Sequence, residues 1–170
     1  MPSFAQHTER DQRIIDRLRT ALDNDLLAHE RFHDVVRLDV KAARIIEVLG
    51  ILKNEFDFNF LTSLCGMHHP GEAMELAVVY HLHSMRNGHR LRVKTWLPMA
   101  HPEIPTATGL WPTANWMERE TWDFYGIRFT GHPNLKRILN MEDFPAFPMR
   151  KDYPLEDPTR HDKNDSMFGR

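Results

Sequence analysis

The stretch MELAVVYHLHSMRNGHRLRVKTWL, residues 74–97, decides the fold class of this 170-residue chain. Apolar and polar residues alternate through both of its halves, which is the period-two pattern of a β-strand. The pair Asn87-Gly88 between the halves is a strong signal for a tight hairpin. The sequence therefore predicts two antiparallel strands, at 74–84 and 89–97, that form a sheet with one apolar face and one polar face.

Segments on both sides of this hairpin extend the sheet and cover it. FNFLTSLCGM at 58–67 predicts a third antiparallel strand, and residues 34–40 alternate as a further strand that runs up to a helix cap at Asp39. Apolar residues at helical spacing predict helices at about 9–24 after a cap at Thr8, at about 40–56, and from about Thr113 to a terminating Gly126. This order predicts an α+β fold, with helices packed on one face of a mostly antiparallel sheet.

The character of the chain changes at Pro133. Residues 133–170 contain five prolines among many alternating charges, a composition that favours an extended conformation. We therefore expect an α+β domain over 1–133 and an extended tail over 134–170 that adds little to the core. Such a tail either is disordered or lies on another protein.

Composition excludes several classes of protein. The 22 basic and 24 acidic residues nearly cancel, so no global charge attracts nucleic acid or an anionic membrane. Cys65 is the single cysteine, which excludes a disulfide framework and an iron–sulfur or cysteine-rich zinc site built from this chain alone; its simplest role is that of a small buried apolar residue. The longest uninterrupted apolar run, LAVVY, is far below the roughly 20 residues that cross a bilayer, so any membrane contact is expected through partners.

Charged and aromatic residues crowd together at 116–134, in WMERETWDFYGIRFTGHPN. On a helix, Glu118 and Glu120 point about 200° apart, so they cannot act as paired carboxylates on one substrate. Arg119 and Asp123 are four residues apart, a spacing at which they could form an ion pair.

The same helix carries aromatic residues on two sides, because Trp116 and Trp122 fall outside its main apolar stripe. One interpretation is burial between its own sheet and a partner protein, with the charges paired inside that interface. The other is an ordinary amphipathic helix with half-exposed tryptophans and solvated charges. The pattern alone leaves both open.

Histidines offer three possible metal sites. HERFH, from His29 to His33, matches the H-E-x-x-H zinc motif, but that motif requires a helix and the residues after it have strand period. The pairs His68-His69 and His81-x-His83 are more typical of hydrogen-bonded or solvated surface residues. We therefore expect no metal site.

A nucleic-acid module is a further alternative. It would use the basic residues on the polar sheet face, which are Arg90, Arg92 and Lys94. That face offers only Trp96 for base stacking, and the net charge of −2 argues against it. No nucleic-acid partner is expected.

The segment ERETWDFYGIRFTGHPNLKRIL, residues 118–139, resembles the signature of a known family, the C subunits of NADH:quinone oxidoreductase, which is respiratory complex I. The similarity continues upstream through PEIPTATGLWPTANW and downstream through PMRKDYPL, and it covers roughly residues 58–155. Relatives of this family also occur in membrane-bound energy-converting nickel–iron hydrogenases.

The resemblance implies a structural and assembly subunit without a redox cofactor or catalytic residues of its own. Such a protein lies in the hydrophilic arm, peripheral to the cytoplasmic face of the inner membrane. It packs on the quinone-site subunit, designated D, and on the neighbouring iron–sulfur subunits B and I. Iron–sulfur clusters, FMN and quinone are then bound by other chains. Structural or interface roles follow for Trp116, Glu118, Arg119, Glu120, Trp122, Asp123, His132, Arg137, Arg150, Lys151 and Asp152.

Overall fold

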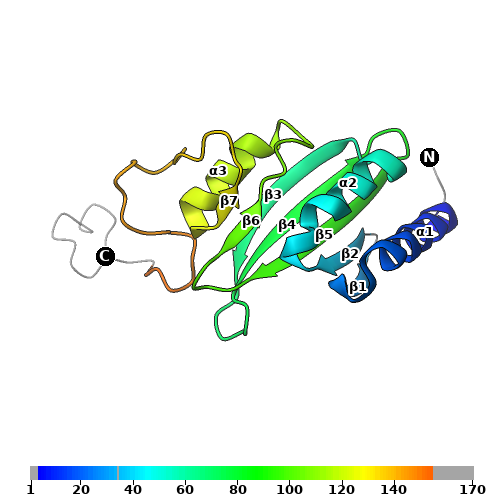
Figure 1. Cartoon of the computed structure of the whole chain (residues 1–170), viewed down its shortest axis with the longest axis horizontal. Helices are drawn as coiled ribbons and strands as arrows, with labels where there is room; N and C mark the ends of the chain where they lie inside the picture. The colour runs from blue at the N-terminus through cyan, green and yellow to red at the C-terminus, as the bar shows by residue number, and fades with distance from the viewer. Residues whose placement is uncertain (1–3, 34, 155–170) are drawn as a thin grey trace, which may run out of the picture.

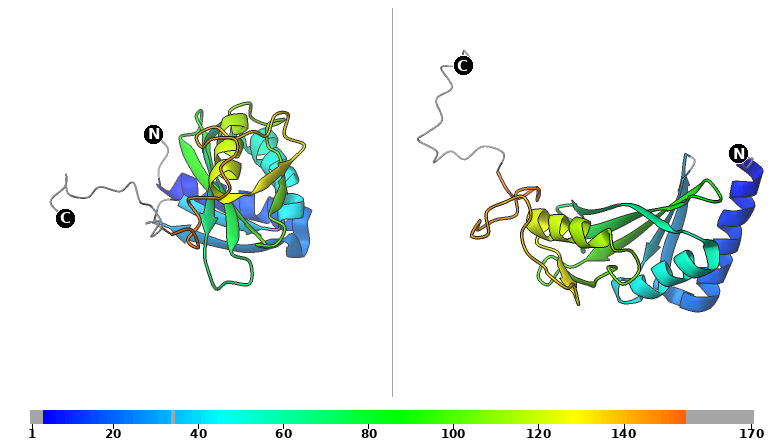
Figure 2. Two further views of the ribbon diagram at one scale, coloured as in Figure 1. Left: turned by 90° about the vertical axis from the view of Figure 1, so that its left-hand side faces the viewer. Right: turned by 90° about the horizontal axis from the view of Figure 1, so that it is seen from above.

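A five-stranded sheet forms the centre of the molecule, and α2 and α3 lie on the same side of it (Figures 1 and 2). The computed structural model describes residues 4–33 and 35–154, so the end of the predicted tail, 155–170, lies outside the described residues. The strand order is β1-β2-β5-β4-β3. Only the pairing of β2 with β5 is parallel in this sheet, which confirms the predicted α+β class with a mostly antiparallel sheet.

The elements follow one another as α1 (Phe4–Leu22), a 3₁₀ turn (Asp23–Asp25), β1 (Leu26–Phe32), β2 (Val35–Val40), a second 3₁₀ turn (Ala42–Arg44), α2 (Ile45–Phe56), β3 (Phe60–His68), β4 (Leu76–Ser84), β5 (His89–Leu97), β6 (Glu103–Pro105), α3 (Ala114–Tyr125) and β7 (Arg128–Thr130). The short strands β6 and β7 pair in parallel as a separate two-stranded sheet. Strands β3, β4 and β5 and the hairpin at Asn87-Gly88 agree with the sequence prediction, and Gly88 takes the left-handed conformation that the turn requires.

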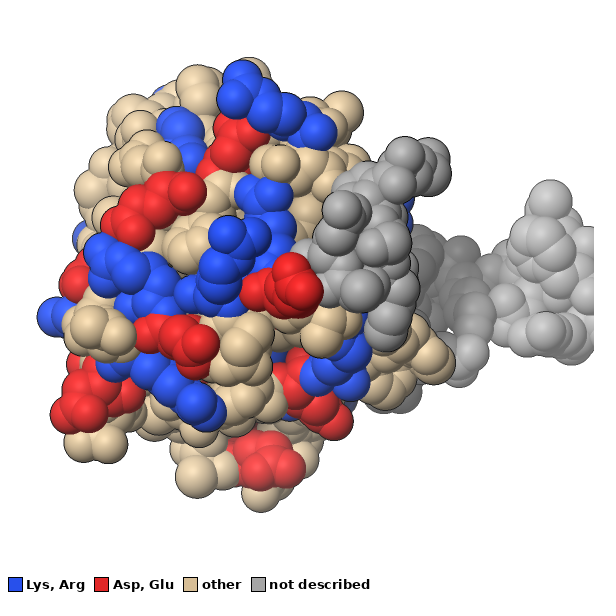
Figure 3. Space-filling view, turned by 90° about the vertical axis from the view of Figure 1, so that its right-hand side faces the viewer, with Lys and Arg blue, Asp and Glu red and all other residues tan. Residues whose placement is uncertain are grey.

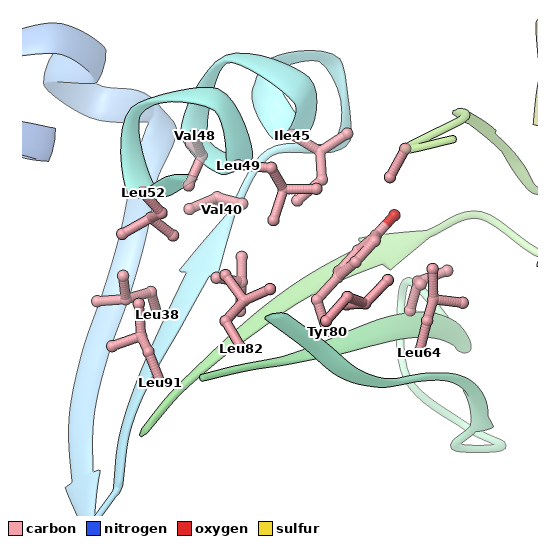
Figure 4. Packing of buried hydrophobic residues seen from close by; sticks show 14 of the residues in the cluster. Leu38, Val40, Ile45, Val48, Leu49, Leu52, Leu64, Tyr80, Leu82 and Leu91 are labelled. Carbon is pink, nitrogen blue, oxygen red and sulfur yellow. The ribbon is translucent and has the colours of Figure 1, made fainter. Parts of the chain in front are cut away.

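The core lies between α2 and the sheet. Leu49 and Leu52 of α2 are fully buried above the strands, and Leu38, Leu82 and Leu91 rise toward them from β2, β4 and β5 (Figure 4). Burial of each such side chain stabilises the fold by about 1.5–3 kcal/mol. The apolar stripe of the helix and the alternating apolar residues of the strands therefore pack against each other in one core.

Two predictions about the ends of elements were wrong, and one strand was missed. Helix α1 begins at Phe4, so Thr8 lies inside it and does not cap it. Asp39 belongs to β2, and α2 begins after Arg44 because a 3₁₀ turn separates strand from helix. Strand β1 was not predicted, because it is an edge strand with most residues exposed and therefore lacks an alternating apolar pattern.

The predicted burial of Cys65 was also wrong, since its side chain is exposed. Successive side chains of a strand point to opposite faces of the sheet. The preceding residue, Leu64, is buried in the core, so Cys65 points to the face away from it.

Candidate partner-docking site

Helix α3 is held closely against β3. Thr113 precedes the helix, and Gly126 ends it in the left-handed conformation, where its N–H donates to Trp122 O at 2.9 Å. A Cβ on Gly66 of β3 would lie 2.5 Å from the Tyr125 ring, so the glycine lets helix and strand approach. The ends of α3 were predicted, whereas this contact has no local signal in the sequence.

Glu118 is a fully buried carboxylate on α3. It accepts hydrogen bonds from the Ala107 backbone N–H at 2.6 Å and from the Thr106 hydroxyl at 2.5 Å. Burial raises the pKa of Glu118 to about 7, against the opposing effect of those two bonds. The side chain therefore ties the loop before α3 to the helix and is closed to any partner.

His132 is buried beside Glu118, and its Nε2 lies 3.9 Å from Glu118 Oε2. Its Nδ1 accepts from the Asn134 N–H at 3.0 Å, so Nε2 carries a proton and donates to Asn115 O at 3.1 Å. His132 thus joins the start of the tail to the first turn of α3.

Asp123 is the second fully buried carboxylate of α3, and it binds the tail. One of its oxygens accepts from the backbone N–H groups of Ile138, Leu139 and Asn140 at 3.1, 2.8 and 3.0 Å. The other lies 2.7 Å from Arg137 Nη1 and also accepts from the Asn140 side chain at 3.0 Å. Burial alone would raise the pKa of Asp123, but these donors hold it well below the usual range.

Arg137 and Arg119 fasten the tail with further bonds. Arg137 donates to Asp123 O and to Phe144 O, and its guanidinium lies 5.5 Å from the centre of the Trp122 ring, which is half-buried. Arg119 donates to the carbonyl groups of Lys136 and Arg137. The Arg119–Asp123 ion pair that their spacing allows does not form, because both side chains bind the tail instead.

Residues 150–153, RKDY, form a second contact between the tail and the sheet. The Lys151 N–H donates to His68 Nδ1 at 2.8 Å, so His68 holds its proton on Nε2, 3.2 Å from Glu75 Oε2. Arg150 pairs with Asp152 at 3.1 Å, and the Lys151 and Asp152 side chains remain exposed. His68, one of the histidines weighed as metal ligands, is instead an anchor that the sequence did not reveal.

The described part of the predicted tail, 134–154, contains no helix or strand, in keeping with an extended segment. It is nevertheless anchored on α3 and β3 by the bonds given above. Large apolar side chains remain exposed on this unit of helix and tail: Trp116 is 60% exposed, Leu139 64% and Met141 71%. Glu120 is exposed, so it lies with Trp116 among the predicted interface residues that another protein can reach.

The H-E-x-x-H interpretation is contradicted by the backbone. His29 lies in β1 and His33 follows the strand in a left-handed conformation, whereas the motif needs both imidazoles on one helix face. Over 4–33 and 35–154, no three His, Cys, Asp or Glu side chains come together as a metal site would require. In the same residues no helix has the length and apolarity to cross a membrane.

The chain matches a known family over most of its length. Residues 38–159 match the family described as respiratory-chain NADH dehydrogenase, 30 Kd subunit. The chain is 44% identical to the C subunit of NADH-quinone oxidoreductase from Roseiflexus sp. (strain RS-1), over 84% of this chain and 83% of that protein. It is 41% identical to the corresponding protein of Citrifermentans bemidjiense, over 88% and 93%.

Two solved structures share the fold. The trypsin-resistant fragment of Nqo5 superposes with a TM-score of 0.66 at 30% identity, over 74% of this chain and 99% of the fragment. A chain of the archaeal membrane-bound sulfane sulfur reductase superposes with a TM-score of 0.71 at 24% identity, over 86% of each chain, which shows a likeness of fold alone. With the family match over most of its length, the chain belongs to the 30 kDa subunit family of respiratory-chain NADH dehydrogenase, as a C subunit of NADH-quinone oxidoreductase.

Proposed function

We propose that this chain is a non-catalytic docking subunit of the hydrophilic arm, which supports electron transfer from NADH to quinone coupled to proton translocation. The observation that carries the proposal is the unit of α3 and tail. Its carboxylates Glu118 and Asp123 are fully buried and bind this chain's own backbone, while large apolar side chains remain exposed on the same unit. Internal anchors combined with exposed apolar groups are typical of a preformed interface.

The partner-binding surface comprises Trp116, Leu139 and Met141, together with the tail that follows. Aromatic residues and methionine are enriched at interfaces, and Trp116 adds a cation–π contact with Arg119 at 5.3 Å that holds its ring in place. Residues 1–133 act as the folded base and 134–170 as the partner-binding extension. The family resemblance supports the quinone-site subunit, D, and the iron–sulfur subunits B and I as the partners.

In this proposal the redox groups belong to neighbouring chains. Iron–sulfur clusters, FMN and quinone are held by other subunits, and the chain lies at the cytoplasmic face of the inner membrane as a peripheral member of the complex. The single cysteine supports this division of labour, because a cluster needs several cysteine ligands.

A second candidate is the equivalent member of another membrane-bound respiratory or hydrogenase complex. The likeness of fold to the sulfane sulfur reductase chain supports it. The higher identity to NADH-quinone oxidoreductase proteins favours the first candidate. Identifying the other subunits that co-purify with the chain from membranes separates the two.

The test of the docking surface compares Trp116→Ala with Met85→Ala in the full chain. Met85 is a matched control, because it is 61% exposed but lies in the turn after β4, away from α3 and the tail. We expect Trp116→Ala to reduce the amount of the quinone-site subunit that co-purifies with the chain about tenfold or more, as for a central interface tryptophan. The melting temperature of the isolated chain should stay unchanged, and equal recovery of the quinone-site subunit with both variants would refute the surface.

A further inference from the structure

The sheet has a second face that α2 and α3 do not cover (Figure 2). On β5 this face carries Arg90, Arg92 and Lys94, which alternate with the core residues Leu91 and Val93. Strand β4 contributes Val79, His81 and His83 to the same face, because their register partners are those three basic residues. The face is therefore basic, although the whole chain has a net charge of −2.

The acidic side chains near this open face form ion pairs with a neighbouring arginine. Glu30 and Asp39 both bind Arg37, at 3.1 and 3.0 Å. Within the part of the chain that the structure describes, the three basic residues of β5 form no ion pair. By contrast, basic and acidic side chains are interspersed on the end of the molecule seen in Figure 3. Lys94 is buried with its Nζ 3.6 Å from the centre of the Trp96 ring, whereas Arg90 and Arg92 are left for a group from outside.

The open face is hollowed along the strands. A hollow of about 500 Å³ lies between Ser63, His83 and Arg90, and a second of about 220 Å³ lies between Cys65, Val79 and Lys94. Both are lined by His81 and Arg92, so the two hollows adjoin as one groove. From His83 to Val79 the groove follows five residues of β4, and the four steps between them span roughly 13 Å at about 3.3 Å per residue. That length fits an extended peptide segment.

His81 shows what kind of group the groove lacks. Burial, and secondarily the charge of Arg92, lower the pKa of His81, so its imidazole is neutral. Arg92 Nε donates to His81 Nε2 at 3.1 Å, which places the imidazole proton on Nδ1. That Nδ1 is buried and has no hydrogen-bond partner among the described residues. A buried N–H without an acceptor is unfavourable unless an acceptor arrives from outside.

We propose that the groove of Ser63, Cys65, His81, Arg90, Arg92 and Lys94 binds an extended acidic segment of a neighbouring subunit. Carboxylate side chains would accept from the Arg90 and Arg92 guanidinium groups and from His81 Nδ1. The buried apolar side chain of Val79, which lines the smaller hollow, suits the remainder of such a segment. This inference rests on the proposed function, since it takes the occupant from the same complex, but it uses the opposite side of the sheet from the surface at Trp116.

The test uses Arg90→Lys in the full chain, assembled in its native complex. Arg90 is exposed at the rim, so this substitution keeps the charge and places an amine where a carbodiimide can couple it to an adjacent carboxylate. We expect mass spectrometry to find position 90 coupled to an Asp or Glu of another subunit. Coupling only to carboxylates of this chain, including those in 155–170, would overturn the proposal. So would the absence of any product in the intact complex, which would indicate solvent or a small anion in the groove.

A charge reversal gives an independent readout. Arg90→Glu should lower the recovery of the chain in the complex about tenfold relative to the wild type at low salt, and less at high salt. Arg128→Glu is the matched control, because Arg128 is also an exposed arginine but lies on β7, outside the groove. Equal recovery of both variants would overturn the groove while leaving the proposed function standing. A wild-type chain that recovers no other subunit would refute the proposed function itself.

Discussion

The guanidinium of Arg137 lies 2.7 Å from Oδ1 of Asp123, and this ion pair joins the C-terminal tail to α3. Asp123 is fully buried and the Arg137 side chain is 9% exposed, so the pair is screened from water. Asp123 also accepts hydrogen bonds from three backbone N–H groups, so its carboxylate oxygens are fully hydrogen-bonded. A buried ion pair is stable only when its remaining hydrogen-bonding capacity is met in this way.

The first prediction concerns Asp123→Asn. The substitution keeps the size of the side chain but removes its charge and directs an NH₂ group at donors, leaving Arg137 without a partner. We expect the free energy of unfolding to fall by about 3 kcal/mol, and hydrogen exchange at 138–140 to accelerate. Asp143→Asn is the control, since Asp143 is an exposed acid of the same tail. Unchanged exchange at 138–140 would contradict the role of Asp123.

The sequence predicts those features of the fold that depend on residues close together in the chain. The hairpin at Asn87-Gly88 and the ends of α3 are encoded within a few residues, and both were correctly predicted. The bonds of Asp123 connect residues 14 to 17 positions apart, and that of His68 to Lys151 connects residues 83 apart. No spacing pattern in the sequence predicts contacts between residues so far apart in the chain.

The charges of α3 illustrate the same limit. The sequence shows an acidic and basic helix flanked by aromatics, which favours an interface as much as a solvated surface. The structure separates the residues: Glu118 and Asp123 are internal, whereas Trp116 and Glu120 are open to a partner. Burial decides this distinction, and burial depends on the loop at 106–108 and on the tail, both outside the helix.

The second prediction concerns the close approach of α3 to β3. Gly66→Ala would place a Cβ 2.5 Å from Tyr125 Cδ2, so the ring and its helix must shift, at a cost of about 1–3 kcal/mol. Gly50→Ala is the matched control on α2, where nothing lies within 4 Å, and it should stabilise by up to about 1 kcal/mol through helix propensity. Melting temperatures of the two variants should move in opposite directions.

A double variant checks the cause of that effect. In a chain that carries Tyr125→Ala, the ring that Gly66→Ala would meet is gone, so adding Gly66→Ala should change the melting temperature little. If the loss from Gly66→Ala is the same with and without the ring, the strain has another origin and the contact is not what positions α3.

The third prediction follows from the buried carboxylate of Glu118, whose pKa is raised from 4.5 to about 7. Between these two values the folded chain keeps a proton that the unfolded chain has lost, so the free energy of unfolding falls as the pH rises through this window. At about 1.4 kcal/mol per pKa unit, the loss from Glu118 approaches roughly 3 kcal/mol by pH 8. Glu118→Gln cannot ionise and still offers an oxygen to the Ala107 N–H, so this part of the pH dependence should disappear.

Urea unfolding at pH 5, 6, 7 and 8 measures the effect, because the other titrating groups are common to both chains and cancel in the difference. The wild type should lose stability relative to Glu118→Gln as the pH rises, with most of the change between pH 5 and 7. Glu120→Gln, a change at a more accessible neighbour on the same helix, should run parallel to the wild type. Parallel curves for Glu118→Gln as well would mean that Glu118 is ionised in the folded chain, and that its bonds to Thr106 and Ala107 outweigh its burial.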